Sequence, residues 1–123
     1  MQNQSSKIKT ELKNRAYQYS IKIIEFIDTL PKDTSSHVIS KQLLRSATSI
    51  GANIVEAKAA SSKNDFTNFF SYALKSANES LYWLRLLRDA KKVKNAHLDY
   101  LLNETNELAN ILGSSILTLK GRK

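Results

Sequence analysis

Apolar residues recur at steps of three and four along four long segments of this chain, and this pattern constrains the fold most strongly. Such spacing places them on one face of an α-helix, and that face must be buried against other helices. The expected helices span about residues 8–30, 36–60, 63–92 and 96–120. The face of the first carries Ile8, Leu12, Ala16, Tyr19, Ile23, Phe26 and Leu30.

The links between these segments are only a few residues long. The sequence has three Gly and one Pro, which leaves little material for the turns of a strand-rich fold. Residues typical of helix ends stand at the boundaries: Pro31, Ser35 or Ser36, Ser62, Asn95 and Gly121. Short links force successive long helices to be antiparallel neighbours. The sequence therefore predicts an all-α fold, one antiparallel up-down-up-down four-helix bundle over residues 1–123.

Gly51 lies in the middle of the second predicted helix. A glycine there costs about 1 kcal/mol relative to alanine. Two interpretations stay open: either a neighbouring helix approaches closely at this point, or the cost is simply tolerated.

The composition restricts the class of protein. There is no cysteine, so disulfides, thiolate metal sites and cysteine nucleophiles are excluded. The first residues are polar and no apolar run approaches the roughly 20 residues of a membrane span, so we expect neither a signal peptide nor membrane insertion. These features are typical of a cytoplasmic protein of one domain.

Positive charge is concentrated near the expected ends of the bundle. The formal net charge is +8. The surplus lies in three segments: Lys7, Lys9, Lys13 and Arg15; Arg85, Arg88, Lys91, Lys92 and Lys94; and Lys120, Arg122 and Lys123. The first and third segments meet at one end of such a bundle, and the second lies at the other. Two basic ends would attract nucleic-acid phosphates, although lysines near helix C-termini are also favoured by the helix dipole alone.

Aromatic residues interleave with arginines in the third predicted helix. Tyr82 and Trp83 stand beside Arg85 and Arg88, and such neighbours can stack nucleic-acid bases. Residues of this kind more often belong to a core or an interface, and we favour that interpretation.

A second set of polar residues shares helix faces beside the apolar stripes. Its members are Gln42, Arg45, Ser49, Asn53 and Glu56 on the second helix, and Ser76 and Glu79 on the third, where Asn68, Tyr72 and Trp83 share the same face. One interpretation is ordinary solvated surface. The other is a polar network, inside the bundle or between subunits, with Arg45 and Glu56 or Glu79 as its charged members. Such networks fix register and oligomeric state more than they add stability.

No arrangement of residues resembles a catalytic site. The two histidines, His37 and His97, lack a partner at metal-ligand spacing on one helix face. There is no glycine-rich phosphate loop, and Glu56 and Glu79 lack the Glu-x-x-His motif of di-metal bundles. We therefore expect a protein that is not an enzyme and uses no metal or cofactor.

Two motifs carry a resemblance to a known family. The first runs Gln42-Leu43-Leu44-Arg45-Ser46-Ala47-Thr48-Ser49-Ile50, followed by Asn53-Ile54-Val55-Glu56-Ala57. The second has Phe66, Phe69, Phe70, Ala73, Ser76, Glu79, Trp83 and Leu84 at family spacing. They resemble Q-L-x-R-[AS]-A-x-S-[IV]-x-x-N-I-x-E-G and F-x-x-F-L-x-x-A-x-G-S-x-x-E of the bacterial four-helix bundle proteins encoded by intervening sequences in large-subunit ribosomal RNA genes. Ala57 and Lys75 stand where that family has glycine.

The resemblance implies a four-helix bundle that forms homo-oligomers, usually ring-like pentamers. A related branch, the accessory variability proteins of diversity-generating retroelements, implies a reverse transcriptase and nucleic acid as partners. We therefore expect a non-catalytic oligomeric module that binds RNA or DNA through basic bundle ends. The alternative is a structural or protein-interaction module without a nucleic-acid ligand.

Overall fold

The computed structural model describes residues 4–90, 92–93 and 95–121, with the backbone alone for residues 4–10. Four helices account for most of this part of the chain: α1 (Gln4–Ile27), α2 (Thr34–Lys58), α3 (Lys63–Asp89) and α4 (Ala96–Leu119). The described residues contain no strand. The predicted all-α class and the four helices are confirmed, with bounds that differ from the predicted ones by four residues or fewer.

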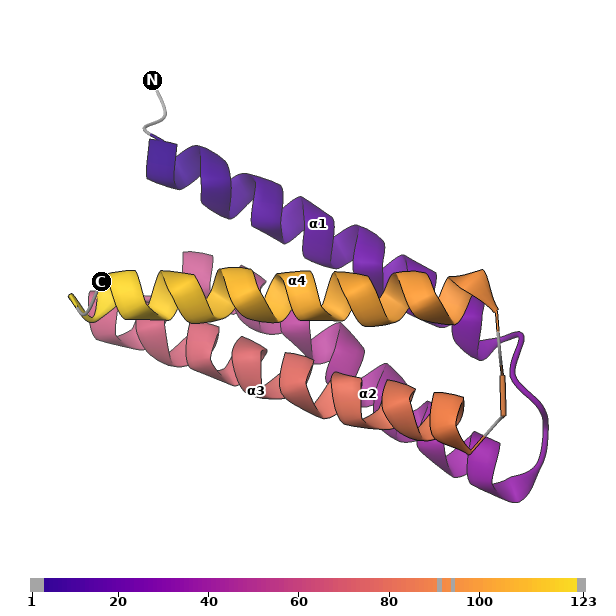
Figure 1. Ribbon diagram of the computed structural model, residues 1–123. Helices are drawn as coiled ribbons and strands as arrows, with labels where there is room; N and C mark the ends of the chain where they lie inside the picture. Colours follow the sequence, from indigo (N-terminus) through magenta and orange to yellow (C-terminus); the bar gives the residue numbers. More distant parts are fainter. Residues whose placement is uncertain (1–3, 91, 94, 122–123) are drawn as a thin grey trace.

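The helices pack as neighbours in chain order, and α4 also contacts α1. Figure 1 shows the α1–α2 and α3–α4 links at one end of the molecule, and the α2–α3 link and the C-terminus at the other. The helix α1 diverges from α4 toward its N-terminal end (Figure 1). The most extensive packing is between α2 and α3, so this pair forms the firmest part of the fold.

The core consists of the apolar stripes that the sequence predicts. Each helix contributes fully buried side chains, among them Ile23, Leu43, Leu84 and Leu108. Burial of one such side chain stabilises the fold by roughly 1.5–3 kcal/mol. Ile8 of the predicted first stripe lies outside the residues whose side chains are described.

The helix ends match the predicted caps at two of three N-termini. The side chains of Ser62 and Asn95 accept hydrogen bonds from the backbone N–H groups of the first turns of α3 and α4. The predicted cap of α2 at Ser35 or Ser36 is wrong, because Asp33 occupies that position. Its carboxylate accepts from the backbone N–H of Ser36 at 2.9 Å and also from both serine hydroxyls.

Gly51 lies where α1 approaches α2 closely. A Cβ atom at Gly51 would lie 3.5 Å from the Cβ of Ala16 and 3.7 Å from its carbonyl carbon. Of the two interpretations of this glycine, close approach of a neighbouring helix is the one the structure supports.

Two side-chain contacts tie α1 to α4 near the middle of both helices. The Arg15 guanidinium donates two hydrogen bonds to the Glu104 carboxylate, at 2.7 and 2.8 Å. One turn further along, the buried hydroxyls of Tyr19 and Thr105 lie 2.6 Å apart. These contacts hold α1 on the bundle at the point where it starts to diverge.

None of the helices, over the described residues, has an apolar stretch long enough to cross a membrane.

Candidate functional site

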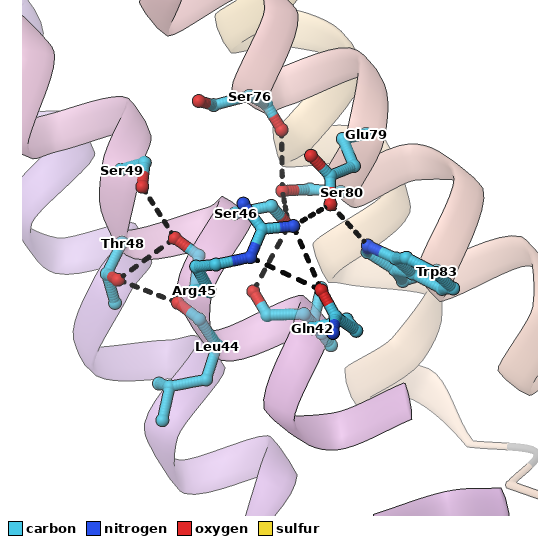
Figure 2. A network of polar contacts seen from close by, with 11 residues as sticks. Gln42, Leu44, Arg45, Ser46, Thr48, Ser49, Ser76, Glu79, Ser80 and Trp83 are labelled. Atoms are coloured by element: carbon cyan, nitrogen blue, oxygen red, sulfur yellow. Dashed lines mark hydrogen bonds and ion pairs between the residues drawn. The ribbon is translucent and has the colours of Figure 1, made fainter. Parts of the chain in front are cut away.

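A polar network joins α2 to α3 on the surface of the molecule (Figure 2). The Arg45 guanidinium forms an ion pair with the Glu79 carboxylate. Gln42 Oε1 accepts from Arg45 Nε at 3.2 Å and from Nη2 at 3.0 Å, and Trp83 Nε1 donates to Glu79 Oε2 at 2.9 Å. We refer to Gln42, Arg45, Glu79 and Trp83 as the α2–α3 network. Hydrogen bonds within the network therefore hold the Arg45 guanidinium and the Glu79 carboxylate in fixed orientations.

Beneath this network lies a buried pair of hydroxyl groups. Ser46 Oγ and Ser80 Oγ are 2.9 Å apart, and both residues are fully buried. Ser80 Oγ also lies 2.8 Å from the backbone oxygen of Ser76, and Ser46 Oγ lies 3.3 Å from that of Leu43. Because each hydroxyl has one proton, the shorter distances favour a chain in which Ser46 donates to Ser80 and Ser80 donates to the backbone. Small side chains at these positions let the two helices approach closely and place the α2–α3 network above them.

The α2–α3 network is accessible to solvent. The Arg45 side chain is 56% exposed and that of Glu79 is 36% exposed. Of the two predicted locations, inside the bundle or between subunits, only the second remains open, because within one chain the network lies at the surface. An exposed pair of this kind stabilises a fold by only about 0.5 kcal/mol, so its geometry matters more than its energy.

The other residues of the predicted polar set lie apart from this network. The Ser49 hydroxyl donates to the backbone oxygen of Arg45, and the Asn53 amide donates to that of Ser49, both within α2. Ser76 contributes its carbonyl oxygen only. Glu56 is exposed and forms no hydrogen bond or ion pair with a described residue. Trp83, which the helical spacing places on the same face as Glu79, joins the network through its indole N–H.

The basic residues near the C-terminus of α4 gather around a shallow hollow. Lys58, Ser62 and Lys63 line it together with Phe66 and Leu119, and its volume is about 360 Å³. Lys120 follows Leu119 directly and is exposed. Lys58 and Lys63 were absent from the predicted basic set, although the short link between their helices already places them at one end of the bundle. The position of Leu119 beside them is a property of the fold.

Two predicted basic residues on the side of α1 differ in environment. Lys13 is exposed and has no ion pair with a described residue, whereas Arg15 is neutralised by Glu104. The hydrogen bonds to Glu104 raise the pKa of Arg15, so its charge is permanent but matched.

At the opposite end, carboxylates match most of the described positive charge. Arg88 pairs with Asp89 at 2.8 Å, and Lys92 pairs with Asp33 at 3.3 Å. Arg85 is exposed, and no ion pair engages it within the described part of the chain. Two of the three described basic residues of the predicted set at this end are therefore paired with carboxylates.

Several members of the predicted basic set cannot be placed. These residues lie outside the described residues or, in α1, outside those whose side chains are described: Lys7, Lys9, Lys91, Lys94, Arg122 and Lys123.

Hydrogen bonds at Asp33 shift its titration. The backbone N–H of Ser36 lowers the pKa of Asp33 well below its ordinary value, and the hydroxyls of Ser35 and Ser36 and the Lys92 ammonium act in the same direction. Burial raises the pKa of Tyr19, which therefore stays protonated at any physiological pH.

The two histidines do not form a reactive site in the described structure. His37 is exposed, and His97 packs edge-on against Phe26 with ring centroids 5.6 Å apart. The described residues contain no group of three His, Cys, Asp or Glu side chains that could hold a metal ion.

Comparisons with known proteins identify the family. Residues 9–114 match the family model of the 23S rRNA-intervening sequence protein. A solved structure from Bacteroides thetaiotaomicron, a protein of unknown function from the S23 ribosomal protein family, is 37% identical and superimposes with a TM-score of 0.81. The match covers 88% of this chain and 96% of that one. No curated protein matches, and neither finding indicates a catalytic family. The chain therefore belongs to the family of 23S rRNA-intervening sequence proteins.

Proposed function

We propose that this protein is a non-catalytic module that assembles with copies of itself and binds RNA or DNA through a basic end of its bundle. One observation carries the nucleic-acid part: Lys58 of α2 and Lys63 of α3 line one hollow together with Leu119, the last residue of α4, which Lys120 follows directly. We further infer that the helices run up-down-up-down, because the short links stand at alternate ends in Figure 1. Absence of cysteine is consistent with a cytoplasmic location.

The electrostatics of this end suit a phosphate backbone. Lysines that neutralise phosphates release condensed counterions, and this release drives binding without reference to base sequence. The N-terminus of α3 lies at this hollow, but so do the C-termini of α2 and α4, so the helix dipoles add no net attraction and the lysines supply it. Phe66 and Leu119 supply an apolar floor beside the charges. The expected ligand is therefore a nucleic acid held mainly by its backbone.

The test is binding of a short RNA and a short DNA duplex across a salt series. A variant with Lys58, Lys63 and Lys120 changed to Glu should lose binding and show a smaller salt slope, by about 1 for each lysine that contacts a phosphate. The matched control changes Lys22, Lys41 and Lys75, which are exposed on the sides of the bundle, to Glu. It alters the net charge equally, so it should lose much less affinity.

Equal losses in both variants would mean that net charge alone attracts the ligand. Absence of binding by the unchanged protein at low salt would refute the nucleic-acid part of the proposal.

The alternative, a protein-interaction module, is favoured by the exposed face of the α2–α3 network. Arginine, tryptophan and tyrosine are the residue types that most often dominate binding energy at interfaces. Arg45 and Trp83 are joined through Glu79, and Tyr82 is 58% exposed beside them. If nucleic acid does not bind, Arg45→Ala should weaken capture of a partner protein, whereas Lys41→Ala should not.

A further inference from the structure

A groove runs between α1 and α2 on the side of the bundle. It has a volume of about 430 Å³. Lys13, Tyr17 and Ser20 line it from α1, and Gly51, Ala52 and Val55 line it from α2. Because its α2 side carries such small side chains, another helix can approach the backbone of α2 closely there.

Large apolar side chains are exposed along this groove and its extension. Tyr17 is 65% exposed, Ile24 and Val55 are each 47% exposed, and Leu44 is 39% exposed. Leu44 and Val55 mark the two ends of the exposed strip on α2, about 16 Å apart at the rise of an α-helix. Several exposed large apolar side chains on one face mark a contact surface more often than bare surface.

The exposed stripe of α1 is symmetric about its own midpoint. Going along the helix and into the turn that follows it, the stripe consists of Lys13, Tyr17, Ser20, Ile21, Ile24 and Asp28, of which Ser20 and Ile21 are half-buried and the others exposed. Tyr17 and Ile24 are equally far from the point between Ser20 and Ile21, and so are Lys13 and Asp28. Asp28 still belongs to the helical path, since its N–H donates to the carbonyl oxygen of Ile24 at 3.2 Å.

The two outer members of this stripe carry opposite charges. Lys13 and Asp28 are both exposed, and neither forms an ion pair or a side-chain hydrogen bond within the described part of the chain. If a second α1 lies antiparallel on the first, Lys13 of each copy faces Asp28 of the other. Tyr17 then faces Ile24, so both the charged and the apolar positions match their counterparts.

We propose that the α1–α2 face is the contact surface between two copies of this chain, which a two-fold axis between Ser20 and Ile21 relates. This proposal rests on the self-assembly part of the proposed function and names its surface. In such an isologous contact every pair of residues occurs twice, so one substitution acts at two places. If the subunits also form a ring, the same two-fold contact would join two such rings.

The charges of this face favour a second copy over a nucleic acid. Asp28 is exposed at one end of the stripe and would repel phosphates, whereas Glu25 beside it pairs with Lys22 at 3.9 Å. Lys13, at the other end, attracts a phosphate as well as it attracts a carboxylate of a second copy. A polyanion is attracted only by Lys13, whereas an antiparallel second copy places an opposite charge against both Lys13 and Asp28.

The experiment measures molar mass by light scattering over a range of protein concentrations at moderate salt. Lys13→Glu and Asp28→Lys, each alone, place like charges together twice, and each should raise the dissociation constant by on the order of tenfold or more. The mass should fall to half at concentrations where the unchanged protein is fully assembled. The double variant, Lys13→Glu with Asp28→Lys, exchanges the two charges and should restore the original mass.

Matched controls separate this contact from general effects. Lys75→Glu makes the same change on the exposed face of α3, and Tyr100→Ser controls for Tyr17→Ser, because Tyr100 is also exposed, at 46%. Tyr17→Ser should halve the mass, and both controls should leave it unchanged. Circular dichroism shows whether each variant stays helical.

The outcomes distinguish this inference from the proposed function. If the unchanged protein is monomeric at every concentration, both this contact and the self-assembly part of the proposed function are wrong. If it assembles but Lys13→Glu and Tyr17→Ser leave its mass unchanged, only the α1–α2 contact is wrong. Loss in each single variant together with recovery in the double variant would establish the antiparallel pairing.

Discussion

At the scale of single residues, Gly51 lowers the stability of α2 but lies where α1 approaches α2 closely. Gly51 faces Ala16 of α1, and a methyl group would meet that residue at ordinary van der Waals distance. Glycine therefore permits the close approach of the two helices but is not required for it. By contrast, Gly121 has φ +68°, which other residues adopt only with strain.

Replacement of Gly51 by alanine should raise the stability of the protein. The expected gain in the free energy of unfolding is about 1 kcal/mol, because alanine loses less conformational entropy in a helix. Denaturant titration measures it. Gly113→Ala is the control, since no atom lies within 4 Å of its added methyl group. A loss of stability at Gly51 alone would show that the added methyl group is not accommodated against α1.

Removal of the buried Tyr19 hydroxyl should lower the stability of the protein. This hydroxyl bonds to Thr105 in the core, while the Thr105 hydroxyl also lies 2.5 Å from the Leu101 carbonyl oxygen. Tyr19→Phe should lower the free energy of unfolding by about 1 kcal/mol, the usual worth of one such bond. The double variant Tyr19→Phe with Thr105→Val tests the pairing: two additive losses would mean that the hydroxyls do not interact.

At the scale of helices, the N-terminus of α2 is stabilised by a carboxylate with several donors. Asp33 caps α2 and also receives the Lys92 ammonium from the α3–α4 link. One side chain thus ties together the two links at that end of the molecule. The contact joins residues 59 positions apart in sequence, so it restricts how these links can move.

The pKa of Asp33 predicts how its contribution depends on pH. Since folding lowers this pKa below the unfolded value near 4, the stabilisation is complete above about pH 4 and is lost as the pH falls through the folded value. Asp33→Ala should therefore lower the melting temperature at pH 7, and this difference from the unchanged protein should shrink on acidification. A difference that stays constant down to strong acid would contradict the role of the carboxylate.

How far the sequence predicts these elements depends on the range of the interaction. Periodicity identifies the buried faces, because burial of one face is a property of a single helix. The cap of α2 was misplaced since Asp33, Ser35 and Ser36 are all good caps, and only the observed backbone distinguishes them. The pair Arg15–Glu104 and the hollow beside Lys63 depend on which helices are neighbours at which height, and no local pattern encodes this.

At the scale of the whole molecule, packing is uneven. The α2–α3 pair carries the closest packing, whereas α1 diverges from α4 and contacts it over a short length (Figure 1). Regions with few packed neighbours open locally at low free energy. The bundle is therefore expected to open at α1 first, with α2 and α3 as its most stable part.

Amide hydrogen exchange tests this order. The amides in the first half of α1 should exchange fastest among the four helices, and those of α2 and α3 slowest. Arg15→Ala should accelerate exchange throughout α1 without affecting the middle of α3, because it removes a tie between α1 and α4. Uniform exchange across all helices would instead indicate that the bundle opens only as one unit.

The hydrogen bond between Trp83 and Glu79 gives the molecule an optical reporter. Trp83 is the only tryptophan, so the long-wavelength fluorescence of the protein comes from one indole ring that sits on the α2–α3 network. Glu79→Ala should shift its emission maximum, and Arg45→Lys should shift it less. A partner that docks on this face should also change the signal, whereas nucleic acid bound at the hollow should leave it nearly constant. The intrinsic emission of the unlabelled protein can therefore reveal which surface a partner occupies.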